Sequence, residues 1–444
     1  MRFFRYLGAG NSLLATMILA TCLPQAIVAG ELDDLYDRGR QVGERGDLPG
    51  SIAIFSDIIQ REPKYARAHY GRGTSWLLSG KEHADKALAD FNEAIRLDPQ
   101  HADAYQNRGL VREKMGDPRG AVADFNEAIR LDRTDPISYR WRGDVFVKQG
   151  DYDKALADFN EAIRLDPRSS AAYRGRGNVR SKLNQPIQAL ADYHAALGLN
   201  PTEALTYCNR GVVRINAGEL HKAFADFNEA IRLDPRYADA YRGRGDVRAK
   251  SNQPIQALAD YEAALGLNPT DPLTHYNRGV VHAETGEFHK ALADYDEAIR
   301  LDPRYVLAYR NRGGVFVEHG DYHKALADFN AAIRSDPTDP ISYRSRGVLF
   351  VKQGEHRKAL ADLTEAIRLD PRSADAYRDR GFAHAESNQP IQALADYATA
   401  LRLDPRNALT YYNRGAVHAN TDELHKSLAD YDDAIRLDPR YAMA

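Results

Sequence analysis

Apolar and polar residues follow one another along this chain with the period of an α-helix. In residues 152–166, for example, the apolar side chains of Ala155, Phe159 and Ala162 recur three or four positions apart. The preceding stretch, 136–149, also carries apolar residues at helical spacing. The pattern therefore predicts two amphipathic helices in this segment, and the same pattern returns throughout the chain.

Turn signals separate the predicted helices. Gly150 suits the left-handed conformation that ends a helix, and Asp151 can cap the helix that follows. In three places, at 184–188, 252–256 and 388–392, this turn is replaced by NQPIQ, in which Asn tolerates the left-handed region and Pro fits the first helical position. Leu-Asp-Pro ends the second helix, because proline cannot continue it. The chain is therefore predicted to be a series of helix–turn–helix units.

The units recur with a fixed period, which the dipeptide Arg-Gly marks. Its glycines are Gly39, Gly73, Gly109, Gly143, Gly177, Gly211, Gly245, Gly279, Gly313, Gly347, Gly381 and Gly415. Each step is 34 residues except the second, which is 36 because LSGKEHADKA carries two extra residues. The predicted units are 32–65, 66–101, 102–135, 136–169, 170–203, 204–237, 238–271, 272–305, 306–339, 340–373, 374–407 and 408–441. This periodicity predicts one all-α repeat array over 31–444, without a linker or a second domain.

Each unit resembles the tetratricopeptide repeat (TPR). In the fourth unit, Gly143 stands at position 8, Ala155 at 20, Phe159 at 24 and Pro167 at 32. The resemblance covers residues 31–444 and implies an all-α, right-handed superhelical α-solenoid of about twelve helix–turn–helix repeats. It also implies a non-enzymatic scaffold that binds protein or peptide in a groove lined by the first helix of each unit.

Two charged positions depart from the family pattern. Position 7 is Arg in all twelve units, from Arg38 to Arg414, where the family commonly has Leu, and position 23 is Asp in all but the first unit, which has Ile54. Buried charges persist only when paired, and the planar fork of Arg can bind a carboxylate bidentately, so we expect an ion pair inside each unit. The candidate pairs are Arg176 with Asp192, Arg210 with Asp226, and Arg244 with Asp260. The alternative is a ladder of ligand-binding arginines.

The resemblance places a ligand groove at positions 2, 5, 6, 9, 12 and 13 of the first helices. The candidate groove residues are Arg140, Arg174, Asn178, Asn209, Arg242, Asn277, Arg310, Asn311, Arg344 and Arg378. Six arginines interspersed with tyrosines at position 5 would form a basic surface, suited to a peptide with acidic residues or a free C-terminal carboxylate. The alternative is a solvated face whose arginines pair with nearby acids.

A clamp for a terminal carboxylate, which some family members use, is matched only in part. Arg174, Asn178 and Asn209 stand at clamp positions, whereas Asp239 and Gly243 occupy places where the clamp needs Lys and Arg. The resemblance therefore does not extend to a complete clamp, and a looser anionic site in these units stays open as an alternative.

Composition narrows the possible functions. Apolar residues make up 43% and charged residues 28% of the 444, as in an ordinary folded protein, and the net charge of −3 gives no reason to expect nucleic acid as a partner. Histidines occur without a carboxylate or cysteine at metal-ligand spacing, and the sequence contains no nucleophile motif or phosphate loop. We therefore expect no enzyme activity, no cofactor and no metal site.

The N-terminus has the pattern of a secretory signal peptide. Arg2 and Arg5 precede an apolar run over 13–23 that is too short to span a bilayer, and small residues up to Gly30 offer a cleavage site. We expect residues 1–30 to be removed and the remainder to be periplasmic or secreted.

Cysteine usage raises one alternative to this processing. LATC, ending at Cys22, resembles a lipoprotein box, but Thr21 departs from the small residue expected before the cysteine, so a lipid anchor is the less favoured prediction. Only Cys208 remains in the rest of the chain, which therefore cannot form an intramolecular disulfide. No later apolar segment is long enough to cross a membrane.

The first unit departs from the repeat pattern, whereas the last unit keeps it. The first departs from the pattern at Leu35 and Ser51, which suits an N-terminal cap. The last keeps its apolar residues Leu428, Tyr431 and Ile435 on the second helix, although the sequence stops soon afterwards. We expect either a frayed helix or an exposed flank, and the second case gives the alternative function of an assembly protein that self-associates through this end.

Overall fold

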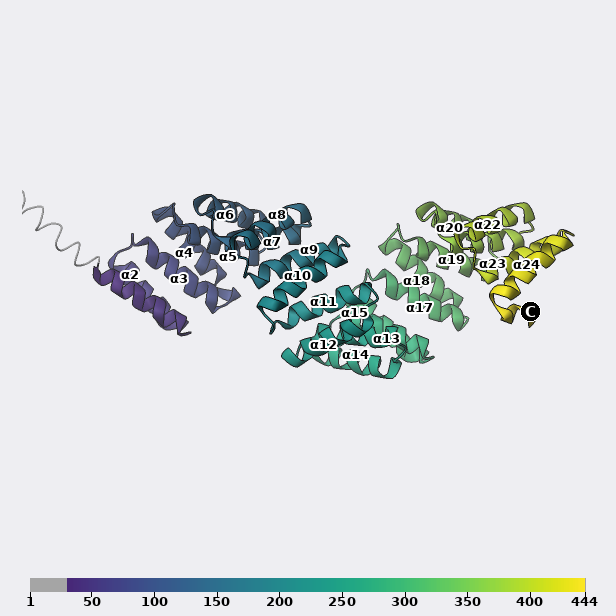
Figure 1. Cartoon of the computed structure of the whole chain (residues 1–444), viewed down its shortest axis with the longest axis horizontal. Helices are drawn as coiled ribbons and strands as arrows, with labels where there is room; N and C mark the ends of the chain where they lie inside the picture. Colours follow the sequence, from purple (N-terminus) through teal and green to yellow (C-terminus); the bar gives the residue numbers. More distant parts are fainter. Residues whose placement is uncertain (1–29, 444) are drawn as a thin grey trace, which may run out of the picture. The chain divides into compact units, whose positions relative to one another are not determined.

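Helix pairs make up the whole of the described chain. The computed structural model describes residues 30–443 (Figure 1), so the expected signal peptide and Cys22 lie outside the described residues apart from Gly30. The first helices of the pairs, called A helices here, are a helix over 30–44, α3 (Ala66–Ser79), α5 (Ala102–Lys114), α7 (Pro136–Gln149), α9 (Ser170–Lys182), α11 (Ala204–Asn216), α13 (Ala238–Lys250), α15 (Pro272–Glu284), α17 (Val306–Glu318), α19 (Pro340–Lys352), α21 (Ala374–Glu386) and α23 (Ala408–Asn420).

The second helices of the pairs are called B helices. They are α2 (Leu48–Arg61), α4 (Ala84–Leu97), α6 (Pro118–Leu131), α8 (Tyr152–Leu165), α10 (Pro186–Leu199), α12 (Leu220–Leu233), α14 (Pro254–Leu267), α16 (Phe288–Leu301), α18 (Tyr322–Ser335), α20 (His356–Leu369), α22 (Pro390–Leu403) and α24 (Leu424–Leu437). Two 3₁₀ helices, η1 (Lys81–His83) and η2 (Pro439–Met443), complete the described part. The predicted all-α array of about twelve helix–turn–helix repeats is confirmed.

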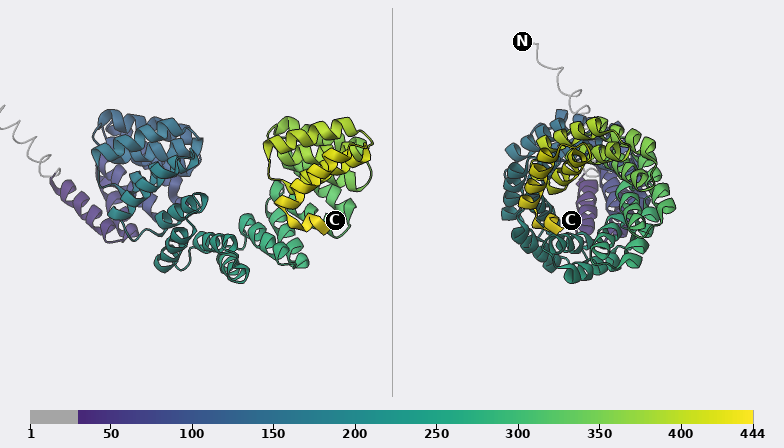
Figure 2. Two further views of the ribbon diagram at one scale, coloured as in Figure 1. Left: turned by 45° about the vertical axis from the view of Figure 1, so that its right-hand side comes forward. Right: turned by 90° about the vertical axis from the view of Figure 1, so that its right-hand side faces the viewer.

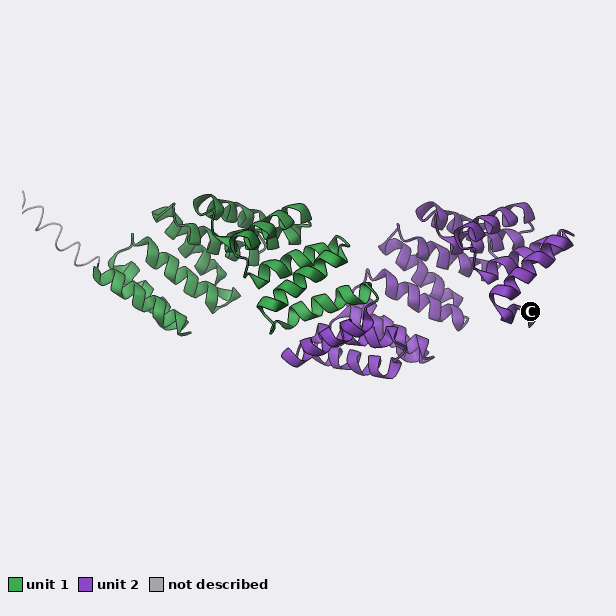
Figure 3. Cartoon of the chain, in the orientation of Figure 1, with its two compact units in different colours: residues 1–218 green, residues 219–444 purple. Residues whose placement is uncertain are grey.

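The chain divides into two compact units, residues 1–218 and residues 219–444 (Figure 3). Within each unit an A helix packs beside the B helix of its own repeat, and that B helix packs on the A helix of the next repeat (Figure 2). Successive A helices, such as α17 and α19, also contact one another, whereas successive B helices in the described chain contact each other less. The A helices therefore line the inner side of each unit, and their free surface is called the A-helix face below.

The turns inside the repeats confirm the sequence prediction. Gly150 ends α7 with φ of 77°, and the carboxylate of Asp151 accepts a hydrogen bond from the backbone N–H of Lys154 at the start of α8. In the NQPIQ turn, Asn184 takes the left-handed conformation with φ of 55°. The two extra residues of the second repeat lie where η1 follows Gly80, whose φ is 128°, so the insertion lengthens the turn and leaves both helices of the pair intact.

The core lies between helices of adjacent repeats. Ala155 and Phe159 of α8 pack on Val179 of α9, which belongs to the next repeat. Within a single repeat, the ring of Tyr193 on α10 lies against Gly177 of α9, where an added Cβ would come within 2.8 Å of ring carbon Cε1. Burying a large apolar side chain contributes about 1.5–3 kcal/mol, so each repeat stabilises its neighbours. The glycine of the Arg-Gly dipeptide is thus required by packing.

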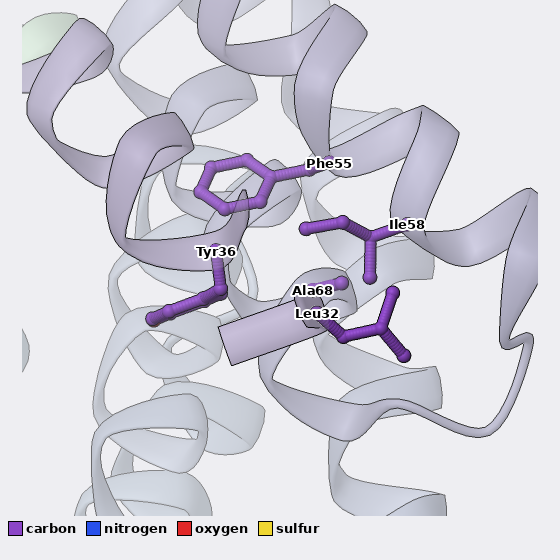
Figure 4. Packing of buried hydrophobic residues seen from close by; sticks show 5 residues of the cluster. All are labelled: Leu32, Tyr36, Phe55, Ile58 and Ala68. Carbon is purple, nitrogen blue, oxygen red and sulfur yellow. The ribbon is translucent and has the colours of Figure 1, made fainter. Parts of the chain in front are cut away.

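The first repeat keeps an apolar interface with the second in spite of its unusual sequence. Leu32 and Tyr36 of the first helix, Phe55 and Ile58 of α2, and Ala68 of α3 form one buried cluster (Figure 4). Their side chains converge from three helices, so the first repeat is packed like the repeats that follow it.

Candidate functional site

The arginine at position 7 and the aspartate at position 23 form salt bridges between the A and B helices of a repeat. Ten pairs are present among the described residues: Arg72–Asp90, Arg108–Asp124, Arg142–Asp158, Arg176–Asp192, Arg244–Asp260, Arg278–Asp294, Arg312–Asp328, Arg346–Asp362, Arg380–Asp396 and Arg414–Asp430. Arg176 binds Asp192 through both Nε and Nη2, and the carboxyl side chain is only 3% exposed. Arg210 and Asp226 belong to different units, so the pair between them stays a prediction.

Most of these arginines also reach the B helix of the preceding repeat. Nη1 of Arg176 donates to the amide oxygen of Asn160 on α8 at 2.7 Å, and Arg142 reaches Asn126 in the same way at 2.6 Å. The recurring Asp-Phe-Asn therefore makes three separate contacts. The carboxylate binds the arginine of its own repeat, the ring packs on glycine, and the amide accepts from the arginine of the next repeat. The structure assigns these residues to the scaffold.

All six candidate arginines at position 5 are bound to carboxylates. Arg140 pairs with Asp144, Arg174 with Glu203, Arg242 with Asp239 and Asp271, Arg310 with Asp339, and both Arg344 and Arg378 with Asp375 and Asp379. The expected surface of free cations is therefore not what the structure shows. The alternative interpretation, in which these arginines pair with nearby acids, describes the observed arrangement.

The pair at the fourth repeat shows how burial acts on two charged groups of this face. Burial raises the pKa of the Asp144 carboxyl, and burial lowers the pKa of the Arg140 guanidinium, although the two groups lie 3.2 Å apart and attract each other. Arg140 also stacks on the ring of Trp141, with 3.9 Å between the guanidinium carbon and the ring centroid. The positive charge of Arg140 is thus engaged on two sides within the repeat.

In eight repeats the side chain at position 5 contacts the last residue of the same repeat, at position 34, and the two residue types match. Four repeats combine Arg or Gln with an acid: Gln106–Asp135, Arg174–Glu203, Arg242–Asp271 and Arg310–Asp339. Four others combine Tyr with Tyr or His, with ring centroids 4.5–6.3 Å apart: Tyr36–Tyr65, Tyr70–His101, Tyr276–Tyr305 and Tyr412–Tyr441. This correlation is visible in the sequence. It was missed because the groove was predicted from positions of the A helices alone.

The residues matched to the carboxylate clamp are engaged inside the protein. The hydroxyl of Tyr193 donates to Oδ1 of Asn178 at 2.8 Å, and Nδ2 of Asn209 donates to the same oxygen at 2.9 Å. Arg174, the third matched residue, is bound to Glu203. The structure therefore brings Asn178 and Asn209 together, but as one internal network rather than as free donors for a terminal carboxylate.

The other candidate asparagines make comparable internal contacts. Asn277 donates to Oδ1 of Asp246 at 2.8 Å, and the hydroxyl of Tyr261 donates to that oxygen at the same distance. Asn311 donates through Nδ2 to the hydroxyl of Tyr276 at 3.0 Å. These hydrogen bonds link consecutive repeats along the A-helix face.

The exposed side chains of the A-helix face include a row of aliphatic residues at position 2. These are Ile137, Leu205, Leu273, Leu307, Ile341 and Leu409, each between 37% and 47% exposed. In the unit over 219–444, a hollow of about 480 Å³ opens among α15, α17 and α19 and is lined in part by Ile341 and Gly314. The family resemblance placed position 2 in the groove, but the aliphatic row and the hollow were not predicted, because the sequence of this face was searched for charge.

Comparison with known protein families gives the same repeat architecture as the structure. Tetratricopeptide repeat families match residues 36–102 and 276–340, 76–143, and 204–237 and 408–441, and a TPR repeat family matches 143–184, 245–286, 347–388 and 386–422. These matches together span most of the sequence. The chain belongs to the tetratricopeptide-repeat family. Tetratricopeptide-repeat proteins bind proteins and peptides, and this chain is accordingly a protein–protein interaction scaffold.

Solved structures with a related fold include three tetratricopeptide-repeat proteins. The crystal structure of the APC/C hetero-tetramer Cut9–Hcn1 is 14% identical, with a TM-score of 0.53, and the likeness covers 92% of this chain and 94% of that one. At this identity the likeness shows the fold alone. YrrB, described as a TPR protein with an unusual peptide-binding site, is 26% identical over 44% of this chain and 97% of its own, with a TM-score of 0.36. Yeast Tom70 is 15% identical over 92% of each chain, with a TM-score of 0.42. No curated protein sequence matches this tetratricopeptide-repeat chain.

Two further observations concern the described residues alone. Between residues 30 and 443, no cluster of three or more His, Cys, Asp or Glu side chains has the arrangement to hold a metal ion. Within the same range, no helix combines the length and the apolar character needed to cross a bilayer.

Proposed function

We propose that this tetratricopeptide-repeat protein is an exported, non-enzymatic scaffold that binds a protein or peptide segment along its A-helix face. The observation that carries the proposal is the row of half-exposed aliphatic side chains at position 2, which recurs on the inner side of both units. An extended segment lying across successive A helices would remove these side chains from water. Because each is already more than half buried, covering the remainder would contribute about 1 kcal/mol apiece before the cost of ordering the segment.

The proposal does not require an acidic ligand. The arginines that suggested one are already bound to carboxylates, as with Arg242 and Asp271 at 2.8 Å, and a ligand carboxylate would have to displace that partner. The face is therefore better suited to a segment that is anchored by apolar side chains and oriented by polar contacts.

Export rests on the sequence of residues 1–30, which lie outside the described part of the chain except for Gly30. A charged start, a short apolar run and small residues before an acidic segment are typical of a cleaved signal peptide. The proposed location of the mature protein is therefore the periplasm or the exterior, and lipid attachment at Cys22 is the less favoured variant.

A matched capture experiment tests the binding proposal. Purified residues 31–444 would be incubated with envelope extract as wild type, as Leu307→Glu/Ile341→Glu, and as a control, Ile255→Glu/Ile391→Glu. Ile255 and Ile391 are 80% and 81% exposed on B helices, so the control adds the same two charges away from the A-helix face. Proteins retained by the wild type and the control but lost from Leu307→Glu/Ile341→Glu support the proposal. Equal capture by all three would contradict it.

Self-association through α24 is a second candidate function. Leu424 and Leu428 on this helix are 63% and 64% exposed, whereas Leu292, the counterpart of Leu428 in the eighth repeat, packs against a core cluster. Two copies could bury these leucines against each other about a two-fold axis. Sedimentation velocity over a range of concentrations would show a concentration-dependent dimer that Leu428→Glu abolishes and Ile391→Glu preserves. A monomer at every concentration excludes this function.

A further inference from the structure

The ninth repeat has an opening on its A-helix face that the neighbouring repeats lack. Position 9 is Gly314 in this repeat, whereas the repeats before and after it carry Val280 and Val348. A Cβ added to Gly314 would meet no atom within 4 Å, so the space in front of this glycine is open. The missing side chain contributes to a hollow of about 480 Å³ on the A-helix face.

The hollow lies within the unit over 219–444 and draws on three successive A helices. Val280 comes from α15, Gly314 and Val315 from α17, and Ile341 from α19, while Tyr295 of α16 lies behind them in the lining. Val315 and Tyr295 are buried core residues, whereas Ile341 is 46% exposed. The volume falls in the range of about 300–1,000 Å³ that is usual for pockets binding small groups. The walls therefore suit a large apolar side chain.

Two carboxylates lie in the lining of the same hollow. Glu284 and Glu318 stand at position 13 of successive A helices, and both are exposed. Neither forms a salt bridge with any described residue, whereas Arg310, the cation in the lining, is held 3.4 Å from Asp339. The uncompensated charge at the hollow is therefore negative, and it favours a positively charged partner group.

A polar group in the lining is also available to a ligand backbone. Asn311 uses Nδ2 to donate to Tyr276, at 3.0 Å. The hydroxyl of Tyr295 also interacts with this amide, but the amide oxygen Oδ1 has two lone pairs and can still accept a hydrogen bond from a peptide N–H. An open hollow with apolar walls and polar groups at its rim has the composition expected of a site for a peptide side chain.

We propose that this hollow anchors one large apolar side chain, Leu, Ile, Met or Phe, of an extended partner segment that carries Lys or Arg beside it. The inference rests on the proposed function and adds to it the chemical class of the partner segment and the repeat that holds its anchor. The negative rim distinguishes this class from the acidic peptides that the sequence of position 5 suggested.

Filling the hollow is the direct test. Gly314→Leu places a side chain in open space in the middle of α17, where removing a helical glycine also favours the fold. Gly266→Leu is the matched control, because Gly266 lies in α14 of the same unit, also faces open space, and is absent from the lining of the hollow. The charge requirement is tested by Glu284→Lys/Glu318→Lys. Its control, Asp153→Lys/Asp432→Lys, makes the same change in net charge on exposed B-helix positions.

The probe is a phage-displayed library of random 12-residue peptides, selected on wild-type residues 31–444. Enriched sequences would then be synthesised and titrated against each variant by fluorescence anisotropy. We expect the enriched peptides to combine a large apolar residue with Lys or Arg. Gly314→Leu should weaken their binding by at least about tenfold, since loss of one buried apolar side chain is worth that much in affinity. Glu284→Lys/Glu318→Lys should weaken binding several-fold, and both controls should bind like wild type.

The outcomes separate this inference from the proposed function. Peptides that lose affinity for Leu307→Glu/Ile341→Glu but bind Gly314→Leu as tightly as wild type would leave the A-helix face as the binding surface and overturn the anchor. Enrichment of acidic peptides, or tighter binding to Glu284→Lys/Glu318→Lys, would overturn the partner class. A selection in which no sequence is enriched over the bare matrix contradicts both proposals.

Discussion

Arg242 holds a guanidinium nitrogen 2.8 Å from the carboxylate of Asp271, 29 residues further along the chain. Asp271 is the last residue of its repeat and also caps α15, where it accepts hydrogen bonds from Thr274. Burial acts to raise the pKa of Asp271, but the hydrogen bonds from Thr274 and Arg242 outweigh it and hold that pKa below its ordinary value. One residue thus joins the end of a repeat to its own A helix and starts the next one.

The residue pair at positions 5 and 34 of one repeat should be replaceable by the pair found in another repeat. We expect Arg242→Tyr/Asp271→Tyr to be less destabilising than the sum of the two single substitutions by about 1 kcal/mol, because the double variant recreates the contact seen between Tyr276 and Tyr305. Urea denaturation of the four proteins in the cycle measures this coupling. Additive effects would show that the two positions are independent.

The salt bridge inside each repeat should be costly to break and much cheaper to replace. Asp158→Ala leaves Arg142 without its carboxylate, which we expect to lower the free energy of unfolding by about 3 kcal/mol. Arg142→Met/Asp158→Leu should regain most of this loss, because no charge is then left desolvated. The free energies of unfolding can be compared by urea titration.

A neighbouring repeat supplies the control for that experiment. Asp192 is bound by Arg180 at 2.8 Å as well as by Arg176. The corresponding change, Arg176→Met/Asp192→Leu, therefore leaves Arg180 without a partner and should regain less stability than the double variant in the fourth repeat. Equal recovery of the free energy of unfolding in the two double variants would indicate that Arg180 is solvated and needs no partner.

Two tyrosines at the same repeat position should respond oppositely to loss of the hydroxyl. Tyr261 donates its hydroxyl to Asp246 at 2.8 Å, whereas the buried hydroxyl of Tyr397 has no hydrogen-bond partner among the described residues. We expect Tyr261→Phe to lower the free energy of unfolding by about 1–2 kcal/mol, and Tyr397→Phe to leave it unchanged or raise it by up to about 1 kcal/mol. Thermal melts of both variants decide this, and a destabilised Tyr397→Phe would refute it.

His275 should make the stability of its repeat depend on pH. A hydrogen bond to Asp294 raises the pKa of His275 above its ordinary value, and the carbonyl of Pro269 adds to the effect. Because the folded-state pKa is the higher one, the contribution is complete below about pH 6.5, the ordinary value for His, and is lost as the pH rises through the raised pKa. The shift in melting temperature between pH 5.5 and pH 8.5 should shrink in His275→Tyr, which restores the residue usual at position 4. An unchanged shift would contradict the assignment.

Much of the scaffold could be predicted because its determinants are local or strictly periodic. The left-handed turn at Asn184 follows from the chemistry of Asn before Gln-Pro, and the contact of Gly177 with Tyr193 follows from a small residue recurring opposite a ring. The pair of Arg176 and Asp192 could be inferred because each charge recurs at a fixed position of adjacent helices. The 34-residue period was therefore enough to predict the core positions and the Arg–Asp ion pairs inside each repeat.

The candidate site was predicted less well. The free charge and the exposure of its side chains depend on neighbouring residues that vary from repeat to repeat. Arg174 reads as a free cation in sequence, but the fold places Glu203 against it. Leu307 stands at position 2, which the family resemblance assigns to the groove, but only the fold shows that its side of α17 is left uncovered. Neither fact can be obtained from the composition of one helix, because pairing and exposure depend on which neighbouring helix covers that face.

The sequence by itself therefore determined the repeat, its turns, the small and aromatic core positions and the family, because a 34-residue period repeats the same local physics twelve times. Only the tertiary structure decided that the arginines at position 5 are neutralised, that the aliphatic residues at position 2 are exposed, and that a hollow opens at Gly314. The physical reason is that free charge and open volume are properties of what surrounds a side chain, and those surroundings come from neighbouring helices of the stack.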